Sequence, residues 1–118
     1  MFKVVFFVPH THVDEVKVAV FDAGAGRLGA YDFASWQTRG IGQFRPLPES
    51  DPFLGDHGRV EHVDEWRVEV ICPEAALPDV LRSLIEAHPY EEPAYEAYRV
   101  YQLSDLEGPG GAATTGIP

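Results

Sequence analysis

The stretch FKVVFFVP, residues 2–9, decides the architecture of the chain. It is apolar almost throughout and rich in β-branched and aromatic residues, a composition typical of a strand that is buried on both faces. Such a strand lies in the middle of its sheet, and Pro9 ends it because proline has no backbone N–H to donate. The run is too short to cross a membrane. The sequence therefore predicts a central strand near the start of the chain.

Two later segments carry apolar residues at helical spacing. In residues 11–26, Thr11 is the expected N-cap, acidic residues fill the first turn and glycines follow the last one. In residues 74–88 the apolar side chains form one stripe, and Pro78 stands in the first turn, where proline costs little. His88 then precedes a second proline, which ends the segment. Both segments predict amphipathic helices.

Three further strands are predicted, for residues 31–38, 65–73 and 94–103. The first two segments alternate between unlike residues, so each presents two different faces. Residues 39–64, between them, have no such pattern and contain many glycines and prolines, which predicts a long loop. A loop of this length in a compact domain usually has a functional role or contacts another subunit. Residues 104–118 are small and polar, and we expect a flexible tail there.

The order of these elements is strand, helix, strand, repeated once. Residues 1–103 fold most simply as one ferredoxin-like βαββαβ domain, an α+β sandwich with a four-stranded antiparallel sheet and two helices on one face. Right-handed crossovers predict that the strands at 2–9 and 65–73 lie side by side and parallel in the centre. The other two strands are then edges, which invite pairing with another chain.

Composition narrows the range of partners. A formal net charge of −10 argues against binding along a nucleic-acid backbone, which needs a basic surface. No signal peptide or membrane segment is visible. The single cysteine, Cys72, excludes an internal disulfide and fits a reducing compartment, so we expect a cytoplasmic protein.

Three motifs together carry a resemblance to a known family. They are GRLGAYDFASWQTRGIGQFRPL at 26–47, VDEWRVEVICP at 63–73 and LIEAHPYEEPAYEAY at 84–98. In these motifs the chain resembles the CutA-like, PII-like domain inserted in many Nif-three-like (YqfO-type) proteins, over about residues 2–103. The resemblance implies a stand-alone insert domain with a ferredoxin-like fold that tends to form trimers, and it implies no settled activity. The dinuclear metal site of the larger family members lies in flanking lobes and is not carried over.

One end of the predicted sandwich gathers metal-binding side chains. Strand directions predict that His10, His12, His88 and Cys72 meet there with Glu91 and Glu92. Imidazole, thiolate and carboxylate are the ligands that a divalent transition metal prefers. The structural alternative, which we favour, makes His88 a helix cap that gains from the helix dipole when protonated. In that alternative Cys72 is a buried thiol on the apolar face of its strand.

The predicted loop offers a second candidate site, for an anion. Repeated glycines can expose backbone amides to an anion, and Arg39 and Arg45 flank Gly40 and Gly42. The resemblance implies that nucleotides bind near such a loop, in the cleft between subunits of PII-like trimers. The alternative, which we favour, is that both glycines serve turn geometry with positive φ.

The sequence favours a non-enzymatic function. We expect a homotrimeric binding or regulatory module that senses a nucleotide or a divalent metal ion at subunit clefts. One alternative is a metal-dependent hydrolase that uses the His10, His12 and His88 end. Another is a purely structural oligomerisation module. An enzyme would need a base and an open metal position in a pocket, and the histidines are the only candidates that the sequence offers.

Overall fold

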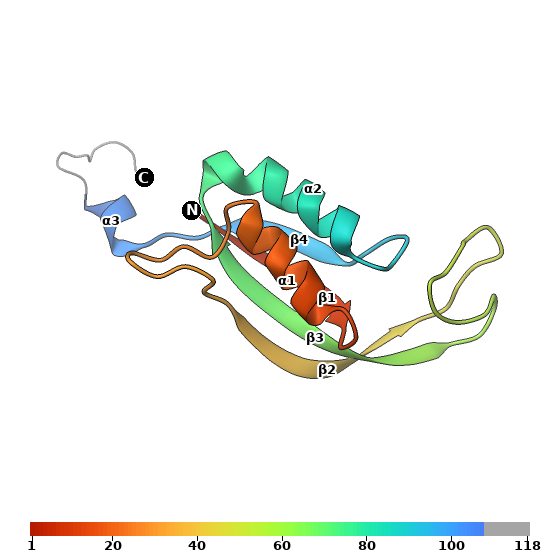
Figure 1. Ribbon diagram of the computed structural model, residues 1–118. Helices are drawn as coiled ribbons and strands as arrows, with labels where there is room; N and C mark the ends of the chain where they lie inside the picture. Colours follow the sequence, from red (N-terminus) through yellow and green to blue (C-terminus); the bar gives the residue numbers. More distant parts are fainter. Residues whose placement is uncertain (108–118) are drawn as a thin grey trace.

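The computed structural model describes residues 1–107 of the chain. They form a four-stranded sheet with two long helices on one face, which confirms the ferredoxin-like α+β fold (Figure 1). The sheet order is β2-β3-β1-β4, and every neighbouring pair is antiparallel. The elements are β1 (Phe2–Pro9), α1 (Val13–Asp22), β2 (Trp36–Phe44), β3 (Glu61–Cys72), a 3₁₀ turn (Glu74–Ala76), α2 (Leu77–Ala87), β4 (Tyr95–Arg99) and α3 (Leu103–Leu106).

The two central strands run antiparallel, so the predicted parallel pairing of residues 2–9 with 65–73 is wrong. Phe2 pairs with Cys72 and Pro9 pairs with Glu65. A helical crossover makes the two strands that it joins parallel, and these are β1 with β2 and β3 with β4. The hairpin from β2 into β3 then reverses the direction, so β3 opposes β1. Cys72 therefore lies at the start of β1, away from Pro9.

The core lies between the sheet and the two helices. Phe6 is its largest fully buried side chain, and Leu84 contributes to the same apolar cluster from α2. Cys72 is a buried free thiol, as the structural alternative predicts, and burial raises the pKa of this thiol. The buried cluster consists of Val4, Phe6, Val8, Val13, Val16, Val20, Ala25, Val68, Val70, Cys72, Val80 and Leu84.

The β2–β3 hairpin differs most from the sequence prediction. β2 begins at Trp36 and runs to Phe44, and β3 begins at Glu61, so the connecting loop covers 45–60 and not 39–64. Residues 31–35, predicted as strand, are irregular, because Phe33 adopts a positive φ of 56° and stacks on Phe21 at a centroid distance of 4.8 Å. The long hairpin extends beyond the helical layer at one end of the molecule (Figure 1).

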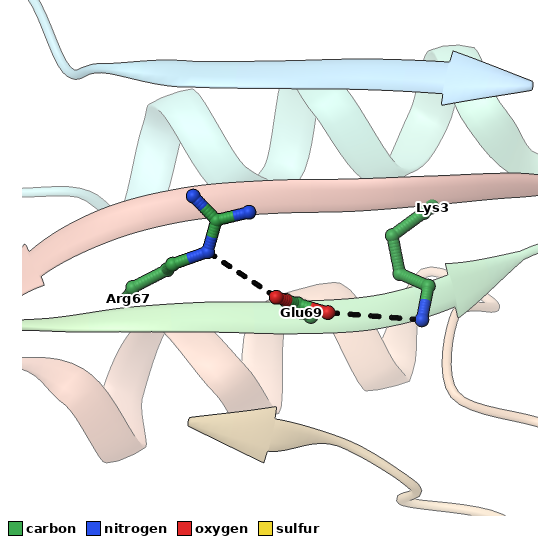
Figure 2. Close-up of polar contacts among 3 residues, drawn as sticks. All are labelled: Lys3, Arg67 and Glu69. Carbon is green, nitrogen blue, oxygen red and sulfur yellow. Dashed lines mark hydrogen bonds and ion pairs between the residues drawn. The ribbon is translucent and has the colours of Figure 1, made fainter. Parts of the chain in front are cut away.

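The face of the sheet without helices carries charged side chains over an apolar centre. Glu69 pairs with Lys3 at 3.8 Å and with Arg67 at 3.2 Å (Figure 2). The guanidinium of Arg67 lies 5.6 Å from the ring centre of Phe7. Val5, on the same face by strand alternation, is fully buried. The aliphatic stems of these long side chains therefore shield the exposed side of β1.

The two ends of the domain meet. The N–H of Val100, just after β4, donates to the carbonyl oxygen of Met1 at 3.0 Å. β4 ends at Arg99, short of the predicted strand end at 103, and α3 begins at Leu103 and runs into the predicted tail. The first turn of α3 is closed by the Gln102 N–H donating to Asp105 at 2.7 Å. The predicted tail over 108–118 lies outside the described residues.

Candidate ligand cavity

A cavity of about 330 Å³ lies where the β2–β3 hairpin meets the turn after α2. Its wall draws on three parts of the chain that are distant in sequence. These are the middle of the sheet, the hairpin with its loop, and the turn that leads into β4. The lining residues are Phe7, Gly42, Gln43, Phe44, Pro46, Ser50, Pro52, Phe53, Leu54, Glu65, Tyr90, Glu91, Glu92 and Ala94.

Aromatic rings form much of this wall. Tyr90 lies 5.9 Å from Phe44 and 6.3 Å from Phe53, measured between ring centres, with both pairs tilted. The imidazole of His12 meets the ring of Phe53 edge-on at 5.4 Å. Tilted and edge-on contacts of this kind are favourable because the positive rim of one ring faces the negative face of the other. The turn at 88–94 and the hairpin loop are therefore held together by their aromatic side chains.

Glu65 places a carboxylate in the cavity. The hydroxyl of Tyr90 donates to its Oε2 atom at 2.8 Å. A Cβ atom at Gly42 would collide with this carboxylate, so glycine there makes room for it. Burial, together with the bond to Glu65, raises the pKa of Tyr90. The phenol therefore remains a hydrogen-bond donor at neutral pH.

The side chain of His88 holds the turn at 88–94 against β1. Its side chain is only 6% exposed, and its Nε2–H donates to the carbonyl oxygen of Phe7 at 2.7 Å. Its Nδ1 atom accepts the N–H of Tyr90 at 3.1 Å. Both ring nitrogens are thus used within the fold, in the neutral form. Burial lowers the pKa of His88, so the expected gain from protonation beside the helix dipole is wrong.

The hairpin loop is fastened to the turn by a carboxylate. Glu91 accepts the backbone N–H of Asp51 at 2.9 Å. Within the loop, His57 donates to the carbonyl oxygen of Ser50 at 2.8 Å. The N–H of Gly58 donates to the carbonyl oxygen of Pro46, also at 2.8 Å. The loop over 45–60 therefore has internal bonds as well as one link across the cavity rim.

The structure does not assemble the predicted metal site. Within residues 1–107, no group of three or more His, Cys, Asp or Glu side chains is arranged to hold a metal ion. His10 is exposed and contributes its backbone N–H to Asp64, while His12 bonds to Thr11 and packs on Phe53. Thr11 does not cap α1, whose N-cap is His12. Glu91 and Glu92 line the cavity instead.

The predicted anion-binding residues lie in a strand. Gly40 and Gly42 belong to β2, and neither has a positive φ, so the turn-geometry alternative is wrong. Arg39 pairs with Asp64 at 3.6 Å and lies 5.5 Å from the ring centre of Trp66. Three of the four residues, Arg39, Gly40 and Gly42, line a second hollow together with Phe7, Thr38, Ile41, Glu65 and Arg67. Arg45 is exposed and is not part of that lining.

The sequence prediction missed Phe44, Phe53 and Glu65 as members of one site. The signals were present, since Phe53 stands in a short apolar run within the loop and Glu65 stands at the start of a predicted strand. The two residues line the same cavity because the β2–β3 hairpin extends further than the sequence predicted.

Comparison with known proteins finds relatives that match most of the chain. No protein-family model matches the chain. A GTP cyclohydrolase 1 type 2 homolog of Halalkalibacterium halodurans is 40% identical over 110 residues, which is 93% of this chain and 30% of that protein. The protein of the same name from Mycobacterium leprae is 47% identical over 96 residues, 81% of this chain and 25% of its own length. The chain thus spans less than a third of these relatives.

Solved structures agree with the sequence matches. A Bacillus cereus protein related to NIF3 superposes with a TM-score of 0.72 and 40% identity, over 86% of this chain and 26% of that one. CutA from Xylella fastidiosa superposes with a TM-score of 0.58 and 16% identity, over 84% of this chain and 82% of its own. The CutA likeness shows the fold alone. The matches to NIF3-related proteins, taken with this fold, show that the chain corresponds over most of its length to one CutA-like domain of NIF3 (Nif-three-like, YqfO-type) proteins.

Proposed function

We propose that this domain is a non-enzymatic, self-associating module that binds a small ligand in the cavity between the hairpin and the turn at 88–94. The cavity itself carries the proposal. It has the volume of a small-molecule site, an apolar lining and a few polar groups that converge on it. The Tyr90 hydroxyl is bonded to Glu65 and has a raised pKa, so it serves as a donor and not as a base.

Self-association follows from the two open edges of the sheet. Within residues 1–107, β2 and β4 each have one neighbouring strand, and β2 exposes Trp36 and Ile41. The two edges are unlike, so joining β4 of one copy to β2 of the next is a head-to-tail contact, which closes into a ring when the rotation between copies allows it. We take the ring to be a trimer, as the family resemblance implies.

A cytoplasmic location belongs to the same proposal and is supported by the lone buried thiol of Cys72.

A nucleotide or a divalent metal ion at subunit clefts is the second candidate. The observation in favour of a nucleotide is the hollow that Arg39, Gly40 and Arg67 line beside the β2 edge. A partner copy on that edge would deepen the hollow. Both arginines are already paired with carboxylates, which weakens their attraction for phosphate and makes this candidate second.

A fragment screen by NMR on the isotope-labelled chain tests the main proposal. We expect bound fragments to shift the amide signals of residues 42–54 and 88–94 more than those of the helices. Replacing Phe53→Ala should abolish these shifts, because it removes one aromatic wall. Leu47→Ala is the matched control, since Leu47 is an exposed residue of the same loop outside the lining. Fragments that collect elsewhere, or bind the Phe53→Ala variant equally well, would overturn the proposal.

A further inference from the structure

The charge of the cavity lining is one-sided. Three carboxylates, those of Glu65, Glu91 and Glu92, line it, and no lysine, arginine or histidine of the described chain does. The whole chain adds to this bias with a formal net charge of −10. An anion would therefore enter against repulsion, and a cation would be attracted.

The carboxylates are not neutralised by neighbouring cations. Among residues 1–107, the ion pairs involve none of the three. Of the guanidiniums in the neighbouring hollow, Arg39 pairs with Asp64 and Arg67 pairs with Glu69, while Arg45 is exposed and lines neither space. Glu65 accepts one bond from Tyr90, which orients its carboxylate and leaves the charge in place. Glu65 is half-buried, and a carboxylate in such a place favours a cationic partner more strongly than one in bulk water, whereas Glu91 and Glu92 are exposed.

The aromatic wall suits a cation as well. Phe7, Phe44, Phe53 and Tyr90 all line the cavity. The negative face of an aromatic ring attracts ammonium and guanidinium groups, and several rings around one space are a common way to bind organic cations. Rings and carboxylates together select a ligand that has both an apolar body and a positive charge.

Size decides between an organic cation and a metal ion. The space of about 330 Å³ is of the order of a small organic molecule. A bare metal ion would leave the rings uncovered and would need three or more ligands, and the described residues offer no such group. The walls therefore fit a body of several carbon atoms.

We propose that the cavity binds a small organic cation: an ammonium or amidinium group carried on an aromatic or alkyl body. The charge lies against Glu65 and Glu92, and the body lies between Phe44, Phe53 and Tyr90. This inference rests on the proposed binding function and names the class of its ligand.

Three compounds of one shape test the charge preference. Phenylpropylammonium, phenylpropanol and phenylpropionate share the same apolar body and differ in charge. Each is titrated into the full chain, with binding measured by NMR shifts of residues 42–54 and 88–94. We expect the ammonium compound to bind at least about 10-fold more tightly than the alcohol, and the carboxylate compound to bind most weakly.

Two variants locate the charge. Glu65→Gln keeps an oxygen that accepts from Tyr90, and Glu92→Gln removes the second charge without touching that bond. We expect each variant to weaken binding of phenylpropylammonium by roughly 5- to 10-fold and to leave phenylpropanol unchanged. Glu49→Gln is the control, because it lowers the charge of the same loop at an exposed residue outside the lining.

Each outcome bears on the inference. Preference for the ammonium compound that both glutamine variants reduce, and Glu49→Gln does not, supports it. Equal or better binding of the alcohol or the carboxylate overturns the cation class and leaves the binding function intact. Binding of none of the three to the folded chain, up to about 10 mM, overturns this inference, and a negative fragment screen in addition overturns the binding function. A lysine-bearing peptide that binds where phenylpropylammonium does not overturns the small-molecule assignment.

Discussion

At the scale of single residues, the cavity depends on His88 and Gly42. His88 connects α2, β1 and the turn through its two ring nitrogens, and Gly42 leaves the space that the Glu65 carboxylate occupies. The sequence identified both residues as special, since a histidine beside a proline and a repeated glycine are unusual in helices and strands. It assigned them other roles, because their true neighbours, Phe7 and Glu65, are distant in the chain.

The two glycines of β2 give a matched pair of variants. In Gly42→Ala the new Cβ displaces the Glu65 carboxylate and weakens its bond with Tyr90, so we expect a loss of about 1 kcal/mol in the free energy of unfolding. In Gly40→Ala the Cβ meets nothing within 4 Å, and stability should stay equal or rise slightly. Urea unfolding of both variants checks this, and equal effects would contradict the assigned contact.

His88 predicts how stability depends on pH. Its pKa is lowered in the folded state, so the unfolded chain binds the proton more readily. The contribution of His88 is therefore complete above about pH 6.5, the ordinary value, and is lost as the pH falls below it. We expect unfolding midpoints to drop between about pH 7.5 and pH 5, with a smaller drop in His88→Gln. His10→Gln, at an exposed histidine, is the control, and identical pH profiles for parent and His88→Gln would refute the assignment.

At the scale of elements, the sequence pattern predicted the helices and strands whose formation depends mainly on neighbouring residues. β1, α1 and α2 follow from apolar pattern together with the residues expected at their ends, and their bounds agree with the prediction to within a few residues. β2 does not, because its glycines favour a loop and its place in the sheet comes from β3. β3 extends for 12 residues, and its residues 61–69 pair with the whole of β2. Tertiary pairing thus overrides weak local propensity. The parallel assignment of β1 and β3 failed for a different reason, a wrong inference about which strands a crossover makes parallel.

The hairpin loop should loosen when its link to the turn is removed. Glu91→Ala deletes the acceptor of the Asp51 N–H. We expect hydrogen exchange across residues 47–54 to become several-fold faster, because local opening no longer has to break that bond. Glu92→Ala is the control, as its neighbour in the same turn. If exchange is equally fast in the parent, the link does not hold the loop.

At the scale of the whole molecule, the long hairpin makes the domain elongated. Its extents are 56 × 26 × 23 Å. A hairpin that projects beyond its own core exposes apolar side chains, and Ile41 in β2 is 74% exposed. Such surface on an edge strand is unfavourable in water unless another chain covers it. Within the described residues, no helix is long and apolar enough to span a membrane.

The exposed β2 edge leads to a prediction about the oligomeric state and about a substitution that should disrupt it. Light scattering at micromolar concentration should return about three times the chain mass of 13.1 kDa. Ile41→Lys places a charge on the β2 edge and should shift the mass toward one chain. Val18→Lys is the matched control, since Val18 is 48% exposed on α1, away from the sheet edges. A parent that is already monomeric would exclude the ring.

The bond between Val100 and Met1 has a consequence for how such a domain can be moved between proteins. The polypeptide enters and leaves the fold at one point, so a host chain could accommodate it within a surface loop without stretching. The entropic cost of closing a loop grows only slowly with its length, and a folded insert with adjoining ends keeps the gap in the host short. The relatives are consistent with this, because the matching segment makes up only 25–30% of their length. Because its two ends adjoin, the domain can be inserted into a surface loop of another protein, by evolution or by protein engineering.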